Sequence, residues 1–252
     1  MKVISNRNIH KPNICKKYSV FYFEIIIFLI KIALFNFVNK KYINYYSEIH
    51  LFIKGSREQK LLNTSFTPEP SEVYVNGIKT DSCKKICYLE GEQSNITLRF
   101  ENQLTSCYKM FDSRTNIIEV DLSDFDASKV TSMSFMFTKC LNLKKINFGK
   151  INTSSLQNMR AICYSCKTLT SIDLTMFDTS KVIDMGYMFS ICSNLKYIDL
   201  SNFDASNLSK ADLMFYNCES LNYLNMRSFK LDNSTTKISM FYSVPENVKF
   251  CT

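Results

Sequence analysis

The chain has 252 residues, of which 46% are hydrophobic and 21% are charged, so it is long enough to bury a sizeable core. It has only 5 glycines and no glycine-rich phosphate-binding loop, which argues against a nucleotide-dependent enzyme. The net charge is +8, but the segment 1–41 holds eight Lys/Arg and one acid, so the rest is nearly neutral and no nucleic-acid partner is expected.

The N-terminal segment predicts a membrane anchor. Residues 1–17 form a basic tail expected to stay in the cytoplasm, and residues 18–38 form a mostly apolar run long enough to span a bilayer as a signal anchor. Glu24 and Lys31 interrupt this run, so a cleaved signal peptide or a helix outside the membrane remains an alternative. The predicted localisation is membrane-anchored, with the repeat domain extracellular or lumenal and residues 18–38 in contact with the membrane.

The next two segments lead into the main domain. Residues 39–71 are expected to be a linker, because "NTSFTPEPSE" has two prolines and little apolar content. Residues 72–109 are expected to form an N-terminal cap. In this cap "EVYVNGIKT" predicts a hairpin, "NITLRF" predicts a strand, and "LTSCYKMF" resembles half of a later repeat.

Residues 110–252 repeat one pattern at a constant interval, giving five full repeats and a partial sixth. A cysteine column contains Cys140, Cys166, Cys192 and Cys218, and an apolar column contains Val120, Ile146, Ile172, Ile198 and Leu224. A fixed period of about 26 residues is typical of stacked-repeat proteins, whose neighbouring repeats share one core. The apolar column is therefore expected to be buried.

Each repeat is predicted to contain a strand, a turn and a short helix. "YIDLS" at 197–201 alternates as a half-buried strand does. In "SKVTSMSFMFTKC" the apolar residues recur every three or four positions, which is typical of a helix face, and Ser128 is a candidate N-cap. The expected fold is an α/β solenoid with one parallel sheet.

Three stretches carry a resemblance to a known family: "VDLSDFDASKVTSMSFMFTKCLNL", "IDLTMFDTSKVIDMGYMFSICSNL" and "IDLSNFDASNL". They resemble the BspA-like leucine-rich-repeat surface proteins, over about residues 96–252. The resemblance implies a leucine-rich-repeat solenoid displayed at a cell surface, where family members mediate adhesion and binding. It implies no catalytic residues. The third repeat departs from the pattern, with Ile162–Cys163 where Met–Phe is usual.

Six of the ten cysteines fall into two groups. The four in the cysteine column, which we call the ladder cysteines, are predicted to be buried free thiols. Parallel side chains in a column do not face one another as a disulfide requires. Cys83 and Cys87 lie outside the repeats and are candidates for a disulfide. The spacing of Cys163 and Cys166 follows from the repeat, so neither a metal nor another cofactor is expected.

The outward-facing strand positions predict a partner-binding face. Its candidate residues are Glu119, Asp121, Lys145, Asp173, Tyr197, Asp199, Tyr223, Asn225 and Arg227. The aromatic residues and the arginine are typical interface anchors, and the expected partner is a protein or glycan at a cell surface. Two alternatives stay open: an ordinary solvated face, or a structural repeat array or gene fragment with no specific ligand.

The remaining motifs are weaker. Candidate glycosylation sequons begin at Asn63, Asn95, Asn152, Asn207 and Asn233, and they matter only in a secretory compartment. The two histidines, His10 and His50, both precede the repeats, and no nucleophile–base pair can be assembled on the repeat pattern. We therefore expect a binding protein and not an enzyme.

Overall fold

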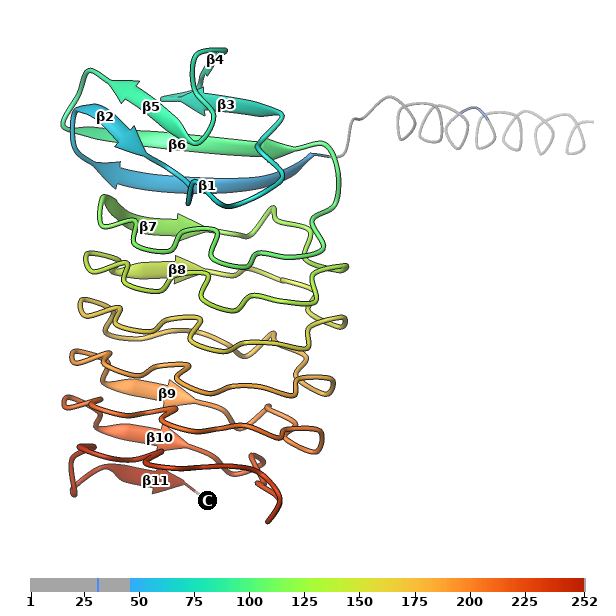
Figure 1. Cartoon of the computed structure of the whole chain (residues 1–252), viewed down its shortest axis with the longest axis vertical. Helices are drawn as coiled ribbons and strands as arrows, with labels where there is room; N and C mark the ends of the chain where they lie inside the picture. The colour runs from blue at the N-terminus through green and yellow to red at the C-terminus, as the bar shows by residue number, and fades with distance from the viewer. Residues whose placement is uncertain (1–30, 32–45, 252) are drawn as a thin grey trace, which may run out of the picture. The chain divides into compact units, whose positions relative to one another are not determined.

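The computed structural model describes Lys31 and residues 46–251. The chain divides into two compact units, Met1–Tyr45 and Tyr46–Thr252, and the strands that the structure describes lie in the second. In this unit a β-rich cap is followed by a stack of similar coils that ends at the C-terminus (Figure 1).

The cap is built on a six-stranded sheet with the order β4-β3-β6-β1-β7-β8. Its strands are β1 (Ser47–Lys54), β3 (Glu72–Val75), β4 (Ile78–Thr80), β6 (Gln93–Phe100), β7 (Ile117–Asp121) and β8 (Lys145–Asn147). Only the β7–β8 pair is parallel, and the others are antiparallel. A separate pair, β2 (Arg57–Lys60) and β5 (Ile86–Leu89), is also antiparallel. The sheet therefore joins the cap to the first two coils.

The central strand β1 lies inside the segment predicted to be a linker, residues 39–71. Its sequence "SEIHLFIK" alternates, and Ile49, Leu51 and Ile53 are buried while the residues between them are partly exposed. This alternation is the ordinary pattern of a half-buried strand. The nearby prolines suggested a linker, but they lie after this strand.

The hairpin expected in the cap is confirmed. Val75 pairs with Ile78 across Asn76 and Gly77, whose φ angles of 50° and 81° are both left-handed. Two left-handed central residues are what a tight type I′ hairpin turn requires, and Asn-Gly is its preferred sequence.

After β7 the chain winds into coils that advance by one sequence repeat per turn, so that Val120 pairs with Ile146 and Ile198 with Leu224. The last coils contribute a parallel sheet with the order β11-β10-β9, formed by β9 (Tyr197–Asp199), β10 (Tyr223–Asn225) and β11 (Lys249–Cys251). The whole apolar column is buried as predicted, at 7% exposure or less. At the strand position of the third coil there is only a bridge, from Ser171 to Tyr197.

The predicted helix in each repeat is wrong, because this stretch is a series of tight turns. Met136, Thr138 and Cys140 donate their N–H groups to carbonyls three residues earlier, whereas Phe135, Phe137 and Lys139 donate to the next coil. Phe135 and Lys139 have left-handed φ angles of 59° and 55°, which no α-helix contains. Successive turns of this kind also bring every third or fourth side chain to one side, which explains the helix-like spacing.

The fold class therefore needs correction. The structure has no helix between residues 46 and 251, and its strands are divided among three sheets, the largest of them mainly antiparallel. The expected α/β leucine-rich-repeat solenoid with one parallel sheet is contradicted. The sequence period reflects the stacking of coils that are rich in β-turns.

The predicted membrane anchor is also contradicted on the residues described. None of them belongs to a helix long and apolar enough to cross a membrane, so the membrane-anchored localisation has no structural support. Apart from Lys31, the predicted tail and span, residues 1–17 and 18–38, lie outside the described residues.

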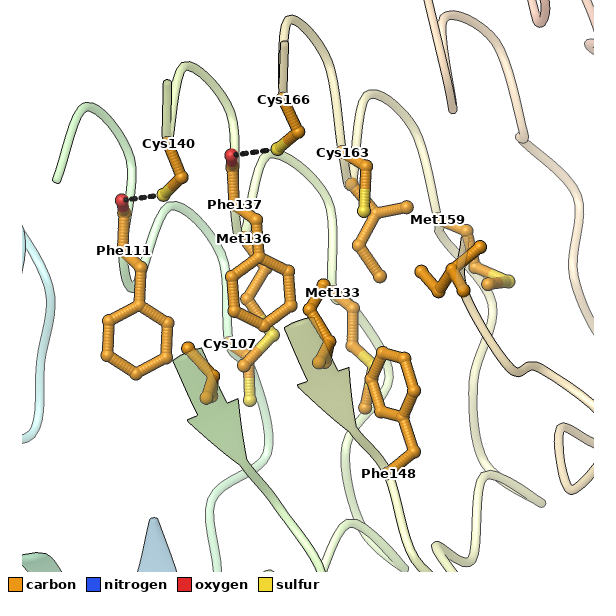
Figure 2. Packing of buried hydrophobic residues seen from close by; sticks show 14 of the residues in the cluster. Cys107, Phe111, Met133, Met136, Phe137, Cys140, Phe148, Met159, Cys163 and Cys166 are labelled. Atoms are coloured by element: carbon orange, nitrogen blue, oxygen red, sulfur yellow. Dashed lines mark hydrogen bonds between the residues drawn. The ribbon is translucent and has the colours of Figure 1, made fainter. Parts of the chain in front are cut away.

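Two ladders run through the core of the coils (Figure 2). Phe111 stacks on Phe137 with ring centroids 5.6 Å apart and an interplanar angle of 8°. The thiol of Cys140 donates to the Phe111 carbonyl at 3.1 Å, and the same bond links Cys166 to Phe137 at 3.0 Å. The ladder cysteines are buried and free, as predicted, and they have the additional role of satisfying a carbonyl of the preceding coil.

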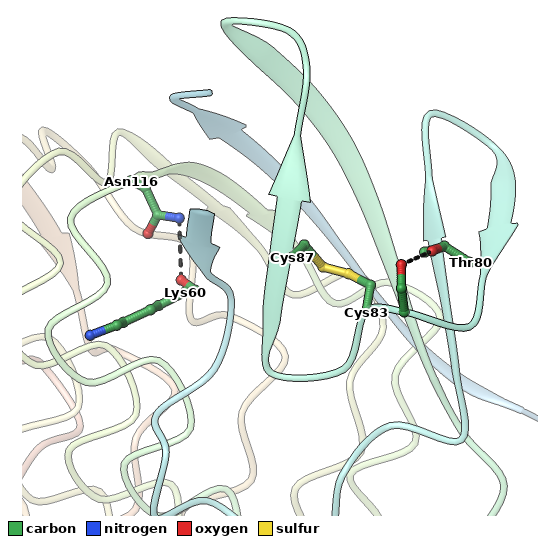
Figure 3. The surroundings of a disulfide bond; sticks show 6 residues. Lys60, Thr80, Cys83, Cys87 and Asn116 are labelled. Carbon is green, nitrogen blue, oxygen red and sulfur yellow. Dashed lines mark hydrogen bonds between the residues drawn. A yellow bond between two sulfur atoms is a disulfide. The ribbon is translucent and has the colours of Figure 1, made fainter. Parts of the chain in front are cut away.

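A disulfide links Cys83 and Cys87 in the cap (Figure 3). It closes the short connection between β4 and β5. Nearby, the Asn116 side chain donates to the Lys60 carbonyl at 3.2 Å, which ties β2 to the first coil. The disulfide thus fixes the β4–β5 connection locally, whereas the Asn116 bond joins the β2–β5 pair to the coils.

Candidate functional site

The polar face of the six-stranded sheet is the best-formed candidate site. Because side chains alternate along a strand, β1 directs Glu48, His50 and Phe52 away from the core. The register then aligns residues of neighbouring strands in rows across this face. One row is Tyr74, Thr97, His50, Asp121 and Asn147, and another is Asn95, Phe52, Glu119 and Lys145.

Except for Tyr74, the residues of these two rows line a hollow of about 340 Å³, which we call the sheet-face hollow. It contains three of the predicted partner-face residues, Glu119, Asp121 and Lys145. The lining residues that were not predicted for this face include His50, Phe52, Asn95 and Thr97. The signal that could have found them is alternation, in "SEIHLFIK" for the residues of β1 and in "NITLRF" for those of β6, which marks each strand as having one polar face.

Hydrogen bonds and charges position the side chains of this hollow. The His50 ring lies 3.0 Å from the Thr97 hydroxyl through Nδ1, and its Nε2 lies 3.4 Å from the carboxylate of Asp124. Burial alone would raise the pKa of Asp121, but hydrogen bonds from Ser123 and Asn147 outweigh it and lower the pKa. Asp121 is therefore a carboxylate held in place, and the hollow has fixed charge.

A network around Arg99 lies on the same face, on β6, β1 and β3. The guanidinium is 2.5 Å from Glu48 and 3.3 Å from Glu72, and its Cζ lies 4.4 Å from the centre of the Tyr74 ring. Hydrogen bonds from Lys79, Tyr74 and Arg99 lower the pKa of Glu72 from 4.5 to about 2. They outweigh the desolvation of this carboxylate, which alone would raise its pKa. Both carboxylates are already paired, so this network is a structural border of the hollow.

Several predicted face residues hold turns. Asp121, Asp173, Asp199 and Asn225 each accept, through Oδ1, the backbone N–H two residues later, at 2.8–3.2 Å. This is the Asx-turn arrangement, in which the side chain completes the turn after the strand. These side chains therefore have a structural role whether or not they also contact a partner.

The structure brings two of the predicted anchors together. Tyr197 and Tyr223 stack with ring centroids 4.6 Å apart and an interplanar angle of 2°, and Tyr197 is 45% exposed. A hydrogen bond with the Cys251 thiol, together with desolvation, raises the pKa of Tyr223 to about 12, so its hydroxyl stays protonated. Arg227 is exposed, and its backbone N–H bonds to Asn225.

The candidate glycosylation residues lie in loops and on the cap. Asn95, Asn152, Asn207 and Asn233 are exposed, whereas Asn63 is half-buried. Asn63 and Asn152 accept backbone N–H groups, and Asn207 donates to the Ser180 carbonyl at 2.6 Å. Within the described part of the chain, no group of three or more His, Cys, Asp or Glu residues is placed to hold a metal ion.

Comparison with known proteins finds a family for most of this unit. The family described as "Mycoplasma protein of unknown function, DUF285" matches residues 92–172 and 142–250. Together the two matches cover well over half of the chain, from the last cap strand through the coils. No curated protein and no solved structure matches the chain.

Proposed function

We propose that this chain, which belongs to the DUF285 family of Mycoplasma proteins of unknown function, binds a macromolecular partner through the polar face of its sheets. The observation that carries the proposal is the sheet-face hollow, whose polar and aromatic side chains come from four adjacent strands. A hollow with convergent polar groups on a rigid scaffold is the usual form of a recognition site.

The partner is a protein or a glycan. Lys145 and Glu119 stand side by side across the parallel β7–β8 pair, so they present opposite charges at the rim. Half-buried Phe52 lies beside Glu119 in the same row and offers an apolar contact. Further along the coils, the exposed Tyr197 ring extends the face as a second anchor.

We also propose that the chain is related to the BspA-like surface proteins, which is more specific than the family match. It rests on the repeated sequence columns, and those proteins mediate adhesion and binding. The leucine-rich-repeat fold is not part of it.

A structural repeat array without its own ligand is the alternative function. It is favoured by one observation: Asp121, Asp173, Asp199 and Asn225 are each hydrogen-bonded within their own turn. If the face served only to stabilise the coils, substitutions at exposed positions outside these turns would not weaken the binding of any partner.

A binding screen of the full chain tests the proposal. The purified protein is presented to arrays of glycans and of extracellular-matrix proteins, and each bound ligand is measured again with Lys145→Glu and with Tyr197→Ala. We expect both variants to weaken binding at least about tenfold, since a few anchor residues carry most of the affinity of an interface. The matched control is Lys167→Glu, an exposed lysine away from the strands.

The screen can contradict the proposal in two ways. Absence of any bound glycan or protein would favour the structural array. A ligand that binds both variants as tightly as the unaltered chain would place the binding site elsewhere. Circular dichroism of each variant confirms that the fold is retained.

A further inference from the structure

A second hollow, of about 410 Å³, lies among the tight turns of the first four coils. We call it the turn-side hollow. Lys109, Phe135, Ala161 and Tyr187 occupy one column of the repeat and have left-handed φ angles of 52–60°. The repeated turn therefore places side chains of four successive coils beside one another, and in this column they differ from coil to coil.

The turn-side hollow is rich in positive charge. Lys109, Lys139 and Arg160 line it, against one lining carboxylate, Asp112. Asp184 lies next to the hollow, but its Oδ1 accepts the Gly186 N–H at 2.9 Å and is 3.7 Å from the Arg160 guanidinium. Within residues 46–251 the Arg160 side chain forms this ion pair and donates no hydrogen bond. Its fork of donors is thus available to an incoming anion.

Arg160 is held in a defined position. Its Cζ lies 4.6 Å from the centre of the Tyr187 ring, a distance typical of a cation–π contact. Gly186 makes this position possible, because a Cβ at residue 186 would come within 2.8 Å of Nη1. The guanidinium is therefore presented on a rigid support, as an anion-binding group requires.

The remaining lining is aromatic and hydroxylated. Phe135, Tyr164 and Tyr187 supply ring surfaces, with the Tyr164 and Tyr187 rings 6.3 Å apart and inclined at 64°. Ser113 and Thr138 add hydroxyl groups that already donate to the Asp112 carboxylate and the Ala161 carbonyl, so each can still accept a hydrogen bond from a ligand. A matching ligand has a negative group, a ring with an apolar side, and several hydroxyls.

We propose that the turn-side hollow binds a carboxylate-bearing sugar unit of an acidic glycan. The carboxylate pairs with Arg160 and is attracted by Lys139 and Lys109, because charge-assisted bonds from a guanidinium to a carboxylate are among the strongest polar contacts. The C–H side of the sugar ring lies against the aromatic rings, and its hydroxyls bond to the hydroxyl groups of the lining. This site is independent of the sheet-face hollow, which shares none of its lining residues.

Calorimetric titration of the full chain with D-glucuronate tests the proposal, with D-glucose and benzoate as comparison ligands. We expect glucuronate to bind, and added salt to weaken the binding because the attraction is electrostatic. Glucose lacks the carboxylate and benzoate lacks the hydroxyls, so each should bind at least about tenfold more weakly. Equal binding of glucose, preferred binding of benzoate, or no binding of glucuronate would overturn the proposal.

Four variants locate the site. Arg160→Ala and Lys139→Ala should each weaken glucuronate binding, the former at least about tenfold, because a charged hydrogen bond is lost. Arg160→Lys keeps the charge and loses the fork. Gly186→Ala keeps all the charges and displaces the guanidinium. Both should therefore also weaken binding, and Gly186 is a positioning residue.

Lys167→Ala is the matched control, since it removes an exposed lysine that does not line the hollow. Unchanged binding in Arg160→Ala and Arg160→Lys, with the fold intact by circular dichroism, would overturn the assignment. Loss of glucuronate binding in these variants with unchanged binding by Lys145→Glu would distinguish this site from the sheet-face hollow.

Discussion

The carboxyl group of Glu72 has a pKa far below its usual value. Its oxygens accept hydrogen bonds from Lys79 at 2.5 Å and Tyr74 at 2.8 Å, and Arg99 lies 3.3 Å away. Together these contacts hold its pKa at about 2. A carboxyl group with a lower pKa in the folded than in the unfolded state stabilises the fold in its ionised form.

We predict that Glu72→Gln removes a pH-dependent part of the stability. The contribution of Glu72 is fully present above the unfolded value near 4.5, and it is lost as the pH falls from there toward 2. The melting temperatures of the variant and the unaltered chain should therefore differ at pH 6 and converge near pH 2. Thermal unfolding followed by circular dichroism measures this difference. Glu90→Gln, at an exposed turn, is the control, and a difference independent of pH would contradict the prediction.

The ladder thiols should resist alkylation in the folded protein. Cys140, Cys166, Cys192 and Cys218 are buried, and burial raises their pKa, so the reactive thiolate is scarce. Among the cysteines of residues 46–251, partly exposed Cys251 should react first. Iodoacetamide labelling followed by peptide mass mapping measures each site, and labelling in guanidinium chloride is the control. A ladder cysteine that reacts as fast as Cys251 in the native protein would contradict the burial.

At the scale of the repeat element, the conformation of each turn determines which positions tolerate a substitution. The glycine at position 149 has a φ angle of 55°, and a Cβ there would come within 2.7 Å of the Ser123 Cα in the preceding coil. The backbones of the two coils thus approach each other closely at this turn. Other repeats place Ser123, Thr175, Ser201 and Arg227 in the same column without a left-handed φ.

We predict that Gly149→Ala destabilises the protein more than Gly77→Ala does. Both glycines have left-handed φ angles, so each variant loses about 1–2 kcal/mol to backbone strain. Only position 149 also meets a neighbour, because a Cβ at position 77 finds nothing within 4 Å. The extra overpacking should cost about 1–3 kcal/mol. Urea unfolding measures both variants, and equal losses would show that the coil relaxes around the methyl group.

At the scale of the whole folded unit, β1 connects the cap to the coils. It pairs with β6 on one side and with β7 on the other, and Leu51 faces Ile96 and Val120 in this register. The buried side chains form one continuous core from Ile49 to Val248. Cap and coils should therefore unfold together.

We predict that Leu51→Ala lowers the free energy of unfolding by about 2–5 kcal/mol, because it leaves a cavity in this shared core. Phe52→Ala, one residue later on the opposite face, should lose less stability, since Phe52 is only half-buried. Urea denaturation measures the two losses. Equal losses, or two separate transitions in the unaltered chain, would show that β1 does not join one cooperative core.

The sequence alone determined the period, the buried column and the hairpin at Asn76–Gly77, because apolar spacing and turn chemistry are local properties. Three of the residues that line the sheet-face hollow, Glu119, Asp121 and Lys145, were also predictable from alternation in the repeats. Tertiary structure alone decided that the 3–4 spacing is formed by turns. The N–H groups of Phe135 and Phe137 bond to carbonyls of the next coil, and only this stacked neighbour can supply these acceptors. It likewise decided that β1 enters the sheet and completes the hollow, since its pairing with β6 and β7 joins residues far apart in the chain.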